Sequence, residues 1–342
     1  MKPQNIILSV IILLILVFSA CREVKVTTKI NRDGTFTRII TVTGDSAEVL
    51  SKGLPFPIDD TWQMKFSKDT MDTTKWAATY SKTFRNSMAL NEEIKSDTSF
   101  YRNLEREVVI TKKFGFFYNY LTFRETYKSV NPFKALDYKD FLTEEDLQWY
   151  GGIRLPVTSA DSTLRDKIEE KVDDFLVKSV IAEIDSILKD GIERLQDPSL
   201  EVKDLTMYYD SLEKIINNWT LDSGAEIIMN LQKWSGNDTW SKLLDLTPPL
   251  FDNFDRKKSE VDTLAFIEAY NEVVEMPGII TATNSEMLRG NQVSWDVHIE
   301  AFFIGDLVMY AESRVINSWA FILSGVVVLA LLVLLGVKAV RR

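Results

Sequence analysis

The sequence predicts an α+β fold, in which a mainly antiparallel sheet carries a long helical insertion and a C-terminal transmembrane helix follows. Three observations lead to this prediction. The first third of the chain alternates apolar and polar residues as strands do, and the segment after Pro277 does so again. The middle third repeats apolar residues at steps of three and four, as helices do. A long uncharged apolar run lies close to the C-terminus.

The first strands are expected to form a hairpin. Residues 23–30 alternate, and Asp33-Gly34 separates them from a second alternating segment at 35–43. Asp-Gly between alternating segments is the strongest short hairpin signal. Further strands are expected at 62–67, 75–84 and 104–114, with a short helix at 86–95.

Aromatic residues crowd the next expected strand, at 116–127. Both faces of its first half are apolar, which is typical of a strand covered on both sides. Two interpretations stay open: a central core strand, or one wall of a cavity for an apolar ligand. The residues of this candidate wall are Phe116, Phe117, Tyr118, Tyr120 and Phe123.

The middle of the chain is expected to begin with a helix of about 35 residues that ends at Pro198. Asp161 or Ser162 could cap its start, and Gly191 could interrupt it. Acidic residues precede basic ones by four positions on its polar face, at Asp174–Lys178, Asp185–Lys189 and Asp190–Arg194. Shorter helices are expected at 201–218, 223–233, 238–245 and 255–275. Strands then return at 279–284, 292–303 and 306–314.

The first 20 residues are typical of a secretion signal. Lys2 precedes an apolar run at 6–18, which spans roughly 20 Å as a helix and is too short for a hydrocarbon core of about 30 Å. The run ends in Val17-Phe18-Ser19-Ala20-Cys21, which resembles the lipobox of bacterial lipoproteins, with Phe18 in place of the usual Leu. We therefore predict cleavage before Cys21 and acylation of Cys21, with palmitate among the attached lipids.

The C-terminal apolar run predicts a membrane span. Trp319 is placed as an aromatic anchor at one interface, and Lys338, Arg341 and Arg342 lie at the other. The positive-inside rule then puts the C-terminus in the cytoplasm and the body outside the cytoplasmic (inner) membrane, in agreement with the lipobox. The predicted organisation is a signal peptide (1–20), a β-rich first part (21–132), a helical insertion (133–276), returning strands (277–316), a transmembrane helix (317–338) and a cytoplasmic tail (339–342).

Charge and composition exclude several classes of function. The formal net charge is -10, and the part between the two apolar segments holds 36 basic and 50 acidic residues, or -14. Such an acidic body argues against nucleic acid as a partner. The single cysteine and the single histidine rule out an internal disulfide and a structural zinc site of the usual kind.

No catalytic, cofactor or metal site is predicted, and the chain is expected not to be an enzyme. Asp296, His298 and Glu300 share one face of an expected strand, which we interpret as an exposed polar face. Two Ser-x-x-Lys matches, at Ser186 and Ser211, lack the companion motifs of penicillin-binding enzymes and are interpreted as chance.

The order of these features resembles the LppM-like lipoproteins of bacteria. The matching pieces are the lipobox at Cys21, one C-terminal span with basic residues, and three short segments: Val24-Lys25-Val26-Thr27, Asn31-Arg32-Asp33-Gly34-Thr35 and Gly290-Asn291-Gln292-Val293-Ser294-Trp295. They cover about a third of the chain. The resemblance implies a small α+β domain outside the membrane that binds lipids or other apolar ligands. The long helical middle departs from that family, and no family site residue carries over.

Three hypotheses for function follow. The first is a non-enzymatic envelope lipoprotein, held to membrane lipid by Cys21 and the terminal helix, that binds or assembles with an envelope protein partner at the outer face of the cytoplasmic membrane. The second is a carrier of a lipid or other apolar ligand. The third is an enzyme of unknown type.

Overall fold

The first two strands form the hairpin that the Asp-Gly turn predicts. In the computed structural model, β1 (Glu23–Ile30) pairs antiparallel with β2 (Phe36–Gly44). Gly34 lies at the turn with a φ of 95°, a conformation that suits glycine and strains other residues. The Asp33 carboxylate accepts hydrogen bonds from the backbone and the hydroxyl of Thr35, which closes the turn.

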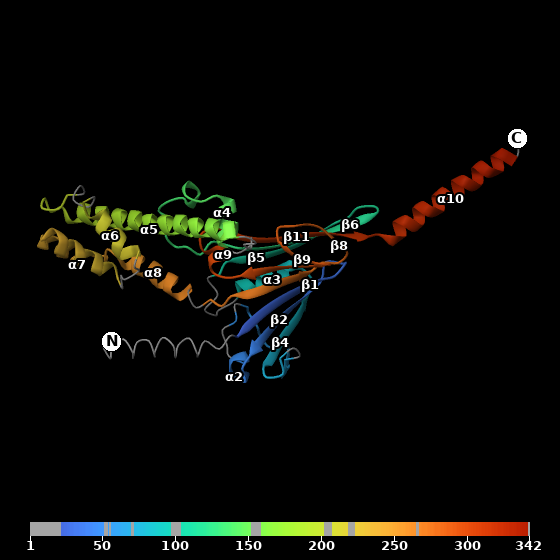
Figure 1. Ribbon diagram of the computed structural model, residues 1–342, viewed down its shortest axis with the longest axis horizontal. Coiled ribbons are helices and arrows are strands. Elements are labelled where there is room, and N and C mark those ends of the chain that lie inside the picture. The colour runs from blue at the N-terminus through green and yellow to red at the C-terminus, as the bar shows by residue number, and fades with distance from the viewer. Residues whose placement is uncertain are drawn as a thin grey trace. The chain divides into compact units, whose positions relative to one another are not determined.

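The structure describes residues 22–50, 54, 56–69, 72–96, 104–151, 159–201, 207–217, 223–264 and 267–340 (Figure 1). They divide into two units. The sheet unit is the described part of Met1–Tyr127, Glu268–Val297 and Val308–Arg342, and the helical unit is the described part of Lys128–Ile267 and His298–Leu307. The predicted signal peptide and Cys21 lie outside the described residues, as do Arg341 and Arg342.

The sheet unit contains two sheets, both mainly antiparallel. Sheet A has the order β3-β4-β2-β1-β7-β10-β9, and sheet B has the order β5-β6-β11-β8. β1 and β7 run parallel. The antiparallel pairs are β1–β2, β2–β4, β3–β4, β7–β10, β9–β10, β5–β6 and β8–β11. The remaining strands are β3 (Gln63–Lys68), β4 (Trp76–Phe84), β5 (Arg106–Lys113), β6 (Tyr118–Tyr127), β7 (Tyr270–Glu275), β8 (Ile279–Thr283), β9 (Met287–Arg289), β10 (Gln292–Val297) and β11 (Leu307–Ile316). The sheet unit also contains the helices α2 (Ser46–Val49), α3 (Ser87–Lys95) and α10 (Ser318–Val340).

The two sheets pack against each other through the buried faces of their central strands, whereas β3, β8 and β9 contain no buried residue. In β2 every second residue from Phe36 to Gly44 is buried, and in β6 the buried residues are Leu121, Phe123, Glu125 and Tyr127. The ring of Phe123 in sheet B lies 6.4 Å from the ring of Trp295 in sheet A, measured between centroids. This alternation is the burial pattern of a sheet with one face in the core and the other exposed to solvent.

The helical unit is built around one long helix, α5 (Ser159–Leu195). Its first half packs with α4 (Glu144–Tyr150) and α9 (Glu300–Phe303) around a core that includes Ile168 and Phe175. Its second half packs in a separate core with four further helical segments. These are α6 (Tyr209–Asn217), α7 (Gly224–Ser235), η4 (Asp238–Asp245) and α8 (Asp252–Leu264), and a short 3₁₀ helix, η2 (Tyr138–Asp140), precedes α4.

The predicted α+β fold with a mainly antiparallel sheet and a helical insertion is confirmed. α5 is continuous through Gly191, which therefore does not interrupt it, and the three predicted acid–base pairs on its surface all form.

Three expectations for individual elements are wrong. The helix expected at 255–275 ends at Leu264, and Tyr270–Glu275 forms β7 instead. The strand expected at 292–303 ends at Val297, because a turn of helix, α9, follows. β6 is buried on one face only, whereas the sequence indicated cover on both.

Candidate functional site

The base of α10 is the first candidate site, and a single residue, Asn317, separates α10 from β11. The most apolar 18-residue window within Ser318–Lys338 has a mean hydropathy of 3.0, and only 6 % of that window is buried. α10 is therefore long and apolar enough to cross a membrane, and it is the only such helix among the described residues. β11 is the neighbour of β6, and Figure 1 shows both strands running to the first turn of α10.

Asn317 bonds this junction to the loop that joins β5 and β6. Its Nδ2 atom donates to the carbonyl oxygen of Gly115 at 2.7 Å and to that of Phe116 at 3.2 Å. Its backbone N–H donates to the carbonyl oxygen of Phe117 at 2.9 Å. Asn119 Nδ2 donates in turn to Asn317 Oδ1 at 2.7 Å. One largely buried asparagine thus satisfies three successive carbonyl groups at the hairpin tip.

Aromatic side chains cover the same junction. Phe116 lies 5.3 Å from Trp319, and Phe117 lies 4.9 Å from Phe321, both measured between ring centroids. Tyr118 lies 5.9 Å from Phe321 in an edge-on arrangement. These contacts place the hairpin tip at the level of the first turn of α10.

The five residues of the predicted ligand wall do not stay together. Phe116, Phe117 and Tyr118 gather at the α10 junction, and Tyr120 is exposed on β6. Only Phe123 is fully buried, between the two sheets beside Trp295. Of the predicted membrane anchors, Trp319 lies in the first turn of α10 and Lys338 in the last.

A buried ionic cluster between the two sheets is the second candidate site. Arg38 Nη2, from β2 in sheet A, donates to Glu125 Oε2 of sheet B and to Glu272 Oε2 of β7, each at 2.9 Å. Thr28 Oγ1 donates to Glu272 Oε1 at 2.8 Å. All four side chains are fully buried. Arg38 Nε and Nη1 have no hydrogen-bond partner in the described part of the chain.

Burial sets the electrostatics of this cluster. Burial lowers the pKa of Arg38, but Glu125 and Glu272 outweigh that effect and raise the pKa above its usual value, so Arg38 stays charged. Burial, opposed by Arg38 and assisted by Glu125, raises the pKa of Glu272 to about 7. A carboxyl with such a pKa suits acid–base chemistry, but catalysis also requires contact with a substrate. Because the cluster is fully buried, the structure favours a role in holding the sheets together.

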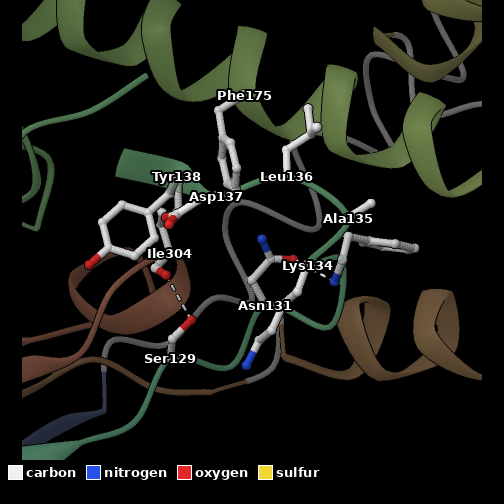
Figure 2. A pocket seen from close by; sticks show the side chains of 10 residues that line it. Ser129, Asn131, Lys134, Ala135, Leu136, Asp137, Tyr138, Phe175 and Ile304 are labelled. Atoms are coloured by element: carbon white, nitrogen blue, oxygen red, sulfur yellow. Dashed lines mark hydrogen bonds between the residues drawn. The ribbon is translucent and has the colours of Figure 1, made fainter. Parts of the chain in front are cut away.

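A pocket of about 380 Å³ in the helical unit is the third candidate site (Figure 2). Leu136, Phe175 and Ile304 supply apolar wall, and Figure 2 shows Phe175 extending from α5 toward Asn131. The remaining lining residues are Ser129, Asn131, Phe133, Lys134, Ala135, Asp137 and Tyr138.

Hydrogen bonds join the lining segment to α9 and to the residue that follows it. The N–H of Asn131 donates to the carbonyl of Phe303 at 2.9 Å, and the Ser129 hydroxyl donates to the carbonyl of Ile304 at 2.8 Å, drawn as a dashed line in Figure 2. The Asn131 side chain accepts from the N–H of Phe133 at 3.0 Å, which fixes the turn that begins the lining segment. The volume lies near the lower end of the range for small-molecule sites.

The polar group around His298 does not form the expected strand face, because β10 ends at Val297 and Glu300 belongs to α9. His298 Nδ1 lies 2.7 Å from Glu300 Oε2, and Asp296 accepts a hydrogen bond from Asn271. Across the ranges that the structure describes, no group of three or more His, Cys, Asp or Glu residues could hold a metal ion.

The residues of the ionic cluster and of the pocket were not among those singled out by the sequence. A signal for the cluster exists, since Arg38 lies on the apolar face of an alternating segment between Phe36 and Ile40. The pocket has no comparable signal, because its lining comes largely from an irregular segment, residues 129–138.

Comparisons with protein-family models, with curated proteins and with solved structures find no match for this chain. The likeness to LppM-like lipoproteins stays a prediction.

Proposed function

We propose that this chain is a non-enzymatic envelope lipoprotein that is anchored in the cytoplasmic membrane by acylated Cys21 and by α10. Its body acts as a binding or assembly module for an envelope protein at the outer face of that membrane. The observation that carries the proposal is the junction at Asn317. A helix long enough to cross a bilayer begins there, directly after β11, and Asn317 is hydrogen-bonded to the tip of the β5–β6 hairpin. Such a junction supports the body as a fixed platform, since a flexible linker would leave it free to reorient.

Two anchors favour assembly with a membrane partner. They confine the body to a thin layer above the bilayer, which raises its effective concentration for any partner in the same layer without new contacts. The predicted net charge of the body reduces non-specific adhesion to anionic lipid, so that a specific contact is needed for binding.

Topology is tested with single cysteines in a Cys21→Ser background, which is otherwise free of cysteine. An impermeant maleimide reagent is expected to label Arg32→Cys in intact spheroplasts, and to label Arg342→Cys only after the membrane is permeabilised. Labelling in the reverse order would reject the proposed orientation.

Assembly is tested by crosslinking the native chain in intact cells, followed by purification in mild detergent. One membrane or envelope protein should co-purify reproducibly, and its yield should fall in Cys21→Ser, which lacks the proposed lipid anchor. If several crosslinkers recover only the uncrosslinked monomer, the proposed assembly with an envelope protein is rejected.

A second candidate function is favoured by the pocket of the helical unit: transport or storage of a small apolar ligand with one polar end. Native mass spectrometry should find a bound molecule that Ala135→Trp, at the lining, excludes. Ala47→Trp, on exposed α2, is the matched control and should retain the molecule. An empty wild-type chain would reject this candidate.

A further inference from the structure

The tip of the β5–β6 hairpin exposes aromatic side chains that the described part of the chain covers only in part. Phe114 is 68 % exposed, Phe116 46 % and Phe117 41 %. Three neighbouring phenylalanines of this exposure are a costly surface in water, and such patches mark contact with a partner or a membrane. The patch is continuous with α10, because Phe116 and Phe117 contact Trp319 and Phe321.

The depth of the tip follows from these contacts. If α10 crosses a bilayer, Trp319 lies at the headgroup level, where tryptophan is enriched, and Phe321 lies about 3 Å deeper along the helix. The rings of Phe116 and Phe117 pack against these two residues, so they reach the same two levels.

The backbone of the tip is prepared for a medium without water. Carbonyl groups that face lipid must be satisfied within the protein, since each unpaired group is expensive there. The carbonyls of Gly115, Phe116 and Phe117 all accept hydrogen bonds from Asn317. An ordinary exposed loop would leave these groups to solvent, so the bonding pattern favours lipid as the medium around the tip.

Basic residues flank the aromatic tip at the level expected for headgroups. Lys112 and Lys113 come directly before Phe114, and both are exposed. The guanidinium carbon of Arg314 lies 5.2 Å from the ring centroid of Tyr118. Cations beside an aromatic belt complement anionic phospholipid headgroups, in contrast to the acidic charge of the body as a whole.

We infer that Phe114–Tyr118 is a membrane-insertion loop that lies in the headgroup and upper acyl region of the same bilayer that α10 crosses, against anionic phospholipid. The inference rests on the proposed membrane span of α10 and adds a second protein contact with the membrane. Two contacts fix the tilt and the rotation of the sheet unit above the bilayer, which one helix alone does not fix.

Depth-dependent quenching tests the loop in the full-length chain. A Cys21→Ser chain receives one cysteine at Phe114, Glu107 or Leu329, is labelled with an environment-sensitive fluorophore, and is reconstituted in phosphatidylcholine–phosphatidylglycerol vesicles. Glu107 lies on β5 about 23 Å from Phe114 in extended chain and serves as the matched control. Leu329 lies in the middle of α10.

The expected result is a different quenching profile for each position. The Phe114 label loses fluorescence to lipids with a nitroxide high on the acyl chain, the Leu329 label loses it to a deep nitroxide, and the Glu107 label loses it to neither. A label at Lys113→Cys should repeat the Phe114 result. This second position controls for any change in the loop that the replacement of Phe114 itself causes.

The outcomes separate the loop from the span. If the Phe114 label is not quenched but the Leu329 label in its own chain is quenched, the insertion loop is overturned and the proposed anchor stands. A protein partner that covers the tip would give this result. An unquenched Leu329 label overturns the anchor itself. Equal quenching of Phe114 in vesicles of phosphatidylcholine alone would overturn the role of the anionic headgroups.

Discussion

Arg38 of sheet A and Glu125 of sheet B form a fully buried ion pair, with Nη2 and Oε2 2.9 Å apart, that joins the two layers of the sheet unit. Glu272 binds the same Nη2 atom at 2.9 Å, so one guanidinium group serves two carboxyl groups. A buried pair of this kind contributes modestly to net stability, but the loss of one partner is severe, because the remaining charge stays in a dry interior.

Arg38→Met is therefore expected to lower the free energy of unfolding by about 3–5 kcal/mol. The change leaves Glu125 and Glu272 buried without their cation. Denaturant titration of the detergent-solubilised chain, followed by tryptophan fluorescence, measures the loss. Arg124→Met, on the exposed face of β6, is the matched control and should change stability little. The triple variant Arg38→Met, Glu125→Leu and Glu272→Leu should regain most of the loss, and its failure to do so would contradict a purely electrostatic cause.

Glu272 predicts a pH dependence of stability. Its pKa is about 7 in the folded chain, because burial raises it, and 4.5 is its ordinary value. Between these values the folded chain holds a proton that the unfolded chain has released. Raising the pH through this window therefore lowers the free energy of unfolding, by a contribution on the order of 3 kcal/mol that is complete above the folded pKa.

Glu272→Gln removes this contribution while it keeps an oxygen for Thr28 and Arg38. The melting temperature of Glu272→Gln minus that of the wild type should rise steadily between pH 4.5 and 7 and then level off. Paired thermal melts across this range measure the difference. A difference that stays constant across it would contradict the raised pKa.

The strands and the long helix follow from periodicity, which a single sequence displays directly. β1 has the predicted bounds, and α5 keeps its course through Gly191 because a stripe of buried residues from Ile168 to Ile192 outweighs the low helix propensity of one glycine. The apolar run of α10 can also be recognised directly in the sequence, because it does not depend on contacts with distant residues.

β7 was missed because its segment, Tyr270–Glu275, is short and follows a run with helical periodicity. Its strand character comes from pairing with β1 and β10, which are distant in sequence, and local propensity does not report such pairing. Because β7 is not predicted, Glu272 cannot be recognised from sequence as the buried partner of Arg38, which lies 234 residues earlier in the chain. Sequence alone predicts cover on both faces of the aromatic segment, because it cannot distinguish cover by protein from an exposed apolar surface beside an apolar helix.

Gly115→Ala is expected to destabilise the β5–β6 hairpin by about 1–3 kcal/mol, because a Cβ atom at this position would lie 2.4 Å from the backbone oxygen of Tyr118. Backbone atoms cannot move aside as a flexible side chain can. Hydrogen exchange at the amides of residues 114–119 measures the effect. A Cβ atom at Gly325, in α10, would meet no atom of the described residues within 4 Å, so Gly325→Ala should leave these amides unchanged.

Asn317→Ala tests whether the hairpin is held to α10 by hydrogen bonds. The change leaves the carbonyls of Gly115 and Phe116 without their side-chain donor, whereas the backbone bond to Phe117 survives. Each orphaned carbonyl costs about 1–3 kcal/mol where water is excluded and less where water can enter. Exchange at the hairpin amides should therefore accelerate, and it should accelerate more in vesicles than in detergent, where the tip can hydrate.

Asn119→Ala is the informative comparison, because it removes both a donor to Asn317 Oδ1 and an acceptor for Asn317 Nδ2. It leaves the two Asn317 bonds to the tip carbonyls in place. Its effect should be smaller than that of Asn317→Ala. If the two variants accelerate exchange equally, the stability of the junction depends on Asn119 holding the Asn317 side chain in its orientation. If neither accelerates it, ring packing against Trp319 and Phe321 holds the tip, and the hydrogen-bonded platform proposed for the membrane surface is wrong.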